Sequence, residues 1–197
     1  MKALMMAAGA AMLLAGCATT APGDMADPVA AMDPTSPLSA PGYMAMAASS
    51  DMFEIESSRL ALQRSRHPAV RQFAQMMIPD HSRTSSEMMA IARELNLPPP
   101  PTQMMPHHME MLDRLRMAGP GEFDSAYKRE QVMAHEEALT LHRNYAEGGD
   151  AEPFRALASR AVPIIQAHWD HARSLPEQMM MEQQEPAPEQ RRSGERG

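Results

Sequence analysis

The chain has 197 residues, with 18 Lys and Arg against 25 Asp and Glu, and its formal net charge is −7 when histidine is neutral. This length suits one domain with flanking tails. The acidic balance, with its only dense basic run at Arg191-Arg192 near the C-terminus, argues against nucleic acid as a partner.

The first segment is typical of an export signal. Lys2 precedes an apolar run over residues 3–15 that is too short to span a bilayer, so we expect residues 1–16 to be a signal peptide. The sequence Leu-Ala-Gly-Cys at residues 14–17 resembles the lipobox of bacterial lipoproteins, which implies cleavage before Cys17 and lipidation of its thiol. Cys17 is the only cysteine, so no intramolecular disulfide can form. An ordinary export signal cleaved near Ala18 is the alternative.

Lipidation predicts a membrane partner and a cellular location. Acyl chains on Cys17 would anchor the protein without a transmembrane helix. Ala18 follows the cysteine, which in lipoproteins of the enteric type resembles the choice for outer-membrane sorting. We therefore expect an exported protein on the periplasmic side of the envelope, as an outer-membrane lipoprotein.

Two flanking segments have too few apolar residues to form a core. Residues 17–42 are rich in Ala, Pro, Thr, Ser, Gly and Asp, and residues 176–197 are rich in Glu, Gln and Pro. Such compositions do not offset the conformational entropy of ordering a chain. We predict a disordered tether and a disordered C-terminal tail.

Residues 43–175 are predicted to form an all-α domain. Aromatic residues make up only 4% of the chain, and good helix formers dominate. Pro and Gly clusters divide the domain and predict helices over residues 43–66, 68–95, 107–118, 122–147 and 151–175. Short connections favour antiparallel neighbours, so we expect an up-down-up-down four-helix bundle with a short extra helix across one end, between the second and third long helices in sequence.

Histidines interrupt the apolar faces of these predicted helices. Helical spacing places His81 and His168 among core positions, and His135 lies beside the apolar line of its helix. Glu56 lies on the apolar stripe of the first helix, with Glu54 as a less well aligned neighbour. A rise of about 1.5 Å per residue, counted from the bends, leaves Glu56 and His81 about 4 to 5 Å apart in depth and His135 and His168 about 7 to 8 Å apart. Side chains lean toward the N-terminus of their helix, which narrows both gaps.

Four stretches carry a family resemblance. They are residues 54–56, RHPAVRQFAQMMIPDHS at 66–82, FDSAYKREQVMAHEEAL at 123–139 and AVPIIQAHWDHA at 161–172. Together they are similar to domain of unknown function family 4142, exported bacterial proteins with a ferritin-like bundle, over residues 43–175. The resemblance implies histidines in the second, third and fourth long helices, matching His81, His135 and His168, and it implies no established activity. No Glu-x-x-His occurs in the chain, which disfavours a di-iron ferroxidase.

Two interpretations of the interior histidines stay open. In the first, His81, His135 and His168, with Glu56 or Asp80, bind one metal ion: zinc, iron or copper. In the second, they are core histidines hydrogen-bonded to carboxylates such as Glu56 and Asp80, without metal.

Two further hypotheses concern other parts of the chain. The 22 methionines and the segment MMPHHMEM at residues 104–111 are compatible with copper handling, since thioethers and imidazoles suit Cu(I). Methionine is also a flexible filler of apolar cores. The remaining hypothesis is a non-enzymatic structural or interaction module, since no Gly-x-Ser-x-Gly or glycine-rich phosphate loop supports catalysis.

Overall fold

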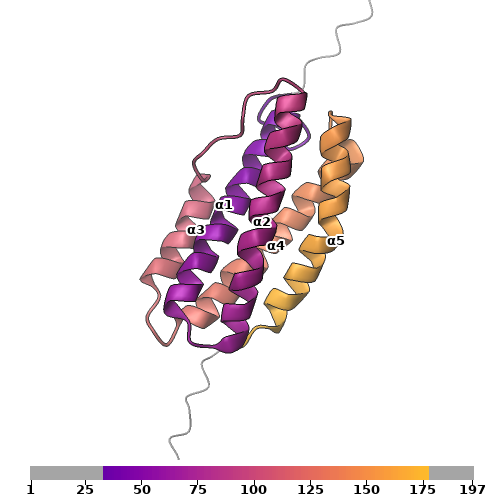
Figure 1. The fold of residues 1–197 in the computed structure, drawn as a ribbon. Coiled ribbons are helices and arrows are strands. Elements are labelled where there is room, and N and C mark those ends of the chain that lie inside the picture. Colours follow the sequence, from indigo (N-terminus) through magenta and orange to yellow (C-terminus); the bar gives the residue numbers. More distant parts are fainter. Residues whose placement is uncertain (1–32, 178–197) are drawn as a thin grey trace, which may run out of the picture. The chain divides into compact units, whose positions relative to one another are not determined.

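The computed structural model describes residues 33–177, which form five α-helices and no strand (Figure 1). The helices are α1 (Ala40–Arg64), α2 (Pro68–Glu94), α3 (Pro106–Met117), α4 (Phe123–Gly148) and α5 (Glu152–Ser174). The all-α class is confirmed, and each helix lies within a few residues of its predicted range. Residues 1–32 and 178–197, including Cys17, lie outside the described part of the chain.

The short helix α3 lies alongside the long helices and not across one end as expected (Figure 1). It packs against α1 and α4, while α5 packs against α4 and α2. The reason is the apolar side of α3: Met111, Leu112 and Leu115 are almost completely buried in the core. A helix placed across the end could not bury these three side chains between α1 and α4.

Residues 33–42, which the composition assigned to the tether, fold onto the domain. Ser39 caps α1, because its Oγ accepts the Gly42 N–H at 3.2 Å, and the Leu38 carbonyl accepts the Asp150 N–H at 3.0 Å. The approach is close: a Cβ on Gly42 would lie 2.1 Å from the Ser36 carbonyl oxygen. Local hydrogen bonds and a glycine therefore order a segment with few apolar residues.

The core consists of apolar regions with a polar layer between them. One apolar cluster includes Phe53, Phe73 and Tyr127, and another includes Tyr145 and Phe154. Between them, α1, α2, α4 and α5 contribute buried polar side chains: Asp51, Glu54, His81, Gln131, His135, His142 and His168. Burying this many polar groups requires partners or a ligand for each.

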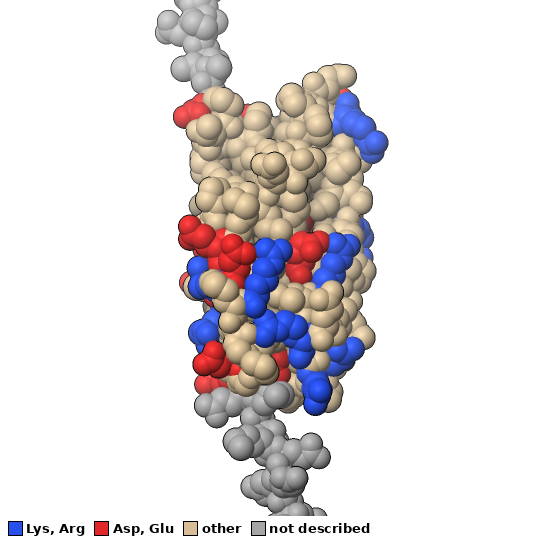
Figure 2. Space-filling view, turned by 90° about the vertical axis from the view of Figure 1, so that its left-hand side faces the viewer, with Lys and Arg blue, Asp and Glu red and all other residues tan. Residues whose placement is uncertain are grey.

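The surface around α3 carries charges of both signs. Figure 2 views the side on which α3 lies in Figure 1, and its Lys and Arg side chains alternate with Asp and Glu in the lower half of the view. This face therefore presents no continuous basic surface. None of the described helices is long and apolar enough to cross a membrane.

Candidate metal centre

Three histidines from three helices converge in the polar layer. His81 of α2, His135 of α4 and His168 of α5 are 8%, 1% and 5% exposed. Their ring centroids lie 5.6 to 5.8 Å apart. One nitrogen from each ring lies within 4.8 Å of the other two.

Helical periodicity accounts for the inward direction of two of these rings. His81 lies four residues after the buried Met77, and His168 lies three residues after the buried Ile165. Residues at these spacings occupy the same face of a helix. His81 and His168 therefore point where the neighbouring apolar side chains point.

Each ring makes a hydrogen bond from one of its two nitrogens to an oxygen atom of the protein. The contacts are His81 Nδ1 to Asp51 Oδ1 at 2.8 Å, His135 Nδ1 to the Gln131 carbonyl oxygen at 2.8 Å, and His168 Nε2 to Asp80 Oδ2 at 3.2 Å. Carbonyl and carboxylate oxygens accept hydrogen bonds, so these nitrogens carry the proton and donate it. In the neutral imidazole the opposite nitrogen then holds a lone pair.

That opposite nitrogen is buried and has no hydrogen-bond partner within residues 33–177. The three atoms are Nε2 of His81, Nε2 of His135 and Nδ1 of His168. Histidines that bind a metal almost always donate their other N–H to a carboxylate, carbonyl or water, as these three do. Around one ion with bonds of about 2.0 to 2.1 Å, nitrogens lie about 3.4 Å apart, so donor nitrogens that lie within 4.8 Å of one another would approach by at most about 1.4 Å. The donor set fits a metal ion.

The carboxylate at the cluster is Glu54 and not Glu56. Glu54 is 1% exposed, its Oε1 lies 3.5 Å from Nδ1 of His135, and neither of its oxygens has a hydrogen-bond partner in the described chain. The Glu56 side chain is 43% exposed and pairs with Arg59 on the surface. Two residues along a helix rotate the side chain to the opposite side, which moves Glu56 out of the interior.

Asp80 and Asp51 hold histidines in place and do not lie among the convergent nitrogens. Asp80 contacts Nε2 of His168 and also accepts from Arg83 at 2.8 Å. The spacing argument missed Asp51, although it lies three residues before Glu54 on the same face of α1. Its Oδ2 accepts from the Ser85 hydroxyl at 2.7 Å, which completes the orientation of the carboxylate.

Burial and neighbouring charges shift the pKa values of the cluster, and they act on His81 in opposite directions. Burial, followed by the positive charge of His81, lowers the pKa of His135 to about 3 and that of His168 to about 4. Burial also acts to lower the pKa of His81, but the hydrogen bond and charge of Asp51 and the charge of Glu54 raise it above its ordinary value. Burial raises the pKa of Glu54 to about 8, against the opposing effect of the His81 charge. At neutral pH, His135 and His168 therefore present lone pairs.

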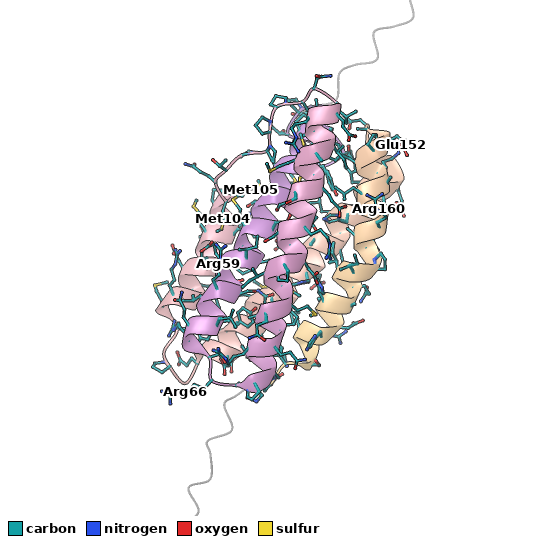
Figure 3. All side chains as sticks on the ribbon, in the orientation of Figure 1. Arg59, Arg66, Met104, Met105, Glu152 and Arg160 are labelled. Atoms are coloured by element: carbon teal, nitrogen blue, oxygen red, sulfur yellow. The ribbon has the colours of Figure 1, made fainter. Side chains whose placement is uncertain are left out.

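A cavity of about 170 Å³ adjoins the histidines and opens to solvent between α2 and α5. His81 and His168 line its inner part, and Ile164, which is 44% exposed, lines it near the surface. Arg160 of α5 lies at this edge (Figure 3), 3.7 Å from Glu87 of α2. The cavity therefore reaches the side of the cluster formed by His81 and His168, while His135 lies outside its lining.

The Met/His segment lies apart from this centre. His107 and His108 are at the start of α3, preceded by Met104 and Met105 (Figure 3). Met111 is buried in the apolar core and Met104 packs against it. These two methionines therefore fill the core, as methionine commonly does.

A sequence profile described as domain of unknown function (DUF4142) matches residues 25–175. The chain belongs to the DUF4142 family. A search of curated proteins finds no match to this DUF4142 chain.

Solved structures of CopM are similar in fold to this DUF4142 chain. The Cu(II)-bound form is 22% identical with a TM-score of 0.59, and the alignment covers 68% of this chain and 93% of CopM. The Cu(I)-bound form is 20% identical with a TM-score of 0.58, covering 68% and 92%. A silver-bound form is 21% identical with a TM-score of 0.57, covering 68% and 92%. At these identities the likeness establishes a shared helical fold.

Proposed function

We propose that this DUF4142 protein binds one copper ion inside its helical domain, through His81, His135 and His168. Two observations support the proposal: the three buried rings bring one nitrogen each to within 4.8 Å of the other two, and each ring has one nitrogen without a partner in the described chain, opposite the nitrogen that orients it. Such a centre binds and holds an ion, and the proposal assigns no reaction to it.

In the alternative, the three histidines only stabilise the core. This accounts for the hydrogen bond that one nitrogen of each ring makes. It leaves the opposite nitrogens and both Glu54 oxygens buried without a described partner. Each unsatisfied buried polar group costs about 1–3 kcal/mol, and native proteins contain few of them. One cation among these atoms would satisfy the three nitrogens together, and the Glu54 carboxylate would offset part of its charge.

The comparisons favour copper over zinc and iron, and the imidazole donors are compatible with copper. CopM has been solved with Cu(II), Cu(I) and silver bound, and no comparison supports zinc or iron. Imidazole nitrogens are suitable ligands for copper, and bound copper would supply a redox-active cation. We propose that the ion enters through the cavity between α2 and α5, which His81 and His168 line.

The location and the finer fold belong to the same proposal. The signal-like residues 1–16 and the lipobox-like cysteine support export and a lipid anchor at Cys17, on the periplasmic side of the envelope. The four long helices and the interior site between them support a ferritin-like, up-down-up-down bundle.

Copper titration of the purified protein tests the site. We expect His168→Gln and His81→Gln to weaken copper binding at the interior by at least about tenfold, measured by calorimetry. His171→Gln is the matched control, since His171 lies three residues after His168 on α5 and outside the cluster. Equal interior affinity in all three variants and the wild type would show that the histidines are structural only.

A further inference from the structure

A second group of donors lies where α3 meets α4. His107 and His108 are the second and third residues of α3, and Glu137 belongs to α4. Oε2 of Glu137 lies 3.5 Å from Nε2 of His107 and 3.9 Å from Nε2 of His108. One donor atom from each of the three residues lies within 4.8 Å of the other two.

His108 has the environment of a positioned ligand. It is 3% exposed, its ring stacks on Phe53 with centroids 5.7 Å apart, and its Nδ1 lies 2.7 Å from the Ser49 hydroxyl. That hydroxyl also accepts the Met105 N–H at 2.7 Å. A hydroxyl oxygen has two lone pairs, so it can accept from His108 Nδ1–H as well.

The other ring nitrogen of His108 is Nε2. It is buried and without a hydrogen-bond partner among the described residues, and Glu137 is the nearest carboxylate to it. With the proton on Nδ1, the lone pair of Nε2 faces the same space as Nε2 of His107 and Oε2 of Glu137. The arrangement repeats the feature of the interior centre, an imidazole anchored at one nitrogen and open at the other.

We propose that His107, His108 and Glu137 form a second metal site, which takes a divalent copper ion from solvent. Two imidazoles and one carboxylate are N and O donors suited to Cu(II). The side chains of His107 and Glu137 are 48% and 53% exposed, so water can complete the coordination. Bonds of about 2.0 to 2.2 Å would bring the three donors about 3.3 Å apart, a small change for two exposed side chains.

The negative charge of Glu137 is essential to this site. The two histidines lie in the first turn of α3, where the helix dipole is positive and opposes a cation. No acidic residue occupies the first turn of α3. Glu137 therefore supplies from α4 the charge that α3 lacks, and the bound ion would connect the two helices.

This connection would add to a salt bridge between the same helices. Arg114 of α3 donates two hydrogen bonds of 2.8 Å to the carboxylate of Glu130 on α4, near the other end of α3. The first turn of α3 follows the proline-rich segment 98–101 and has no side-chain cap. An ion at His107, His108 and Glu137 would hold this end of the helix to α4.

Titration of the full-length protein with Cu(II) alone, followed by calorimetry and electron paramagnetic resonance, tests the second site. We expect the wild type to bind two equivalents with distinct spectra. Glu137→Gln and His107→Gln should each weaken one equivalent by at least about tenfold and remove its spectrum, leaving the other unchanged. Both side chains are about half exposed, so these variants are expected to fold.

Glu136→Gln is the matched control, because Glu136 is an exposed neighbour on the same helix and lies outside the group of donors. If Glu137→Gln binds Cu(II) as Glu136→Gln does, the second site is refuted. His168→Gln should remove only the other equivalent. The interior centre and the second site therefore succeed or fail independently.

Discussion

Replacing Glu54 with Gln should stabilise the metal-free protein while weakening copper binding. The Glu54 pKa is about 8 in the folded protein, because burial disfavours the charged carboxylate, against an ordinary value of 4.5. A group with a raised folded pKa contributes full stability below pH 4.5, and this contribution is lost as pH rises toward 8. Each pH unit in this window corresponds to about 1.4 kcal/mol, so at pH 7 the wild type has lost about 3 kcal/mol.

A Gln at this position does not titrate, so it avoids that loss. The free energy of unfolding of Glu54→Gln should exceed that of the wild type by an amount that grows from pH 4.5 to pH 8 and reaches about 3 kcal/mol near pH 7. Urea denaturation of both metal-free proteins across this range measures the difference. Glu56→Gln, two residues away with a side chain 43% exposed, should show no such trend. A Glu54→Gln difference that is constant with pH would refute the assignment of Glu54 as the buried carboxylate.

Four other predictions concern separate parts of the molecule. Asp51→Asn should weaken interior copper binding by about 10 to 100-fold in calorimetry, because Asp51 orients the ring of a ligand histidine. Burial lowers the pKa of His142 to about 4, so its contribution to stability is present above pH 6.5 and lost as pH falls toward 4. Between pH 6.5 and 4, the melting temperature should therefore decline less steeply in His142→Gln than in the wild type. Gly42→Ala should lower the free energy of unfolding by about 1–3 kcal/mol, whereas Gly121→Ala, with no atom within 4 Å of its Cβ, should not. Cys17→Ser should move the protein from the membrane fraction to the soluble fraction on cell fractionation.

Helical periodicity located the histidines but misplaced the carboxylate. His81 and His168 follow buried apolar residues at spacings of four and three, so the apolar pattern alone indicates their direction. On α1 the apolar pattern is weak, because many of its buried residues are Ala and Ser, as well as Asp51 and Glu54. Small residues can face the core or solvent at little cost, so they do not indicate which glutamate points inward.

The second group of donors shows a different limit of prediction from sequence. His107 and His108 stand out in the sequence, but nothing in the sequence connects them with Glu137, 29 or more residues later. Their proximity depends on α3 packing alongside α1 and α4, where burial of Met111, Leu112 and Leu115 holds it. The helix was expected across one end, a position in which the histidines would have had other neighbours.

By itself, the sequence determined the helical class, the approximate bounds of the helices and the presence of imidazoles on core faces. These features follow from local propensity, from proline and glycine breaks and from a period of 3.6 residues, all of which act over short stretches of chain. Only the tertiary structure decided which acids stand beside the rings, which ring nitrogens remain open and where α3 lies. Those outcomes depend on contacts between residues far apart in the chain, which form when whole helices pack and apolar surface is buried.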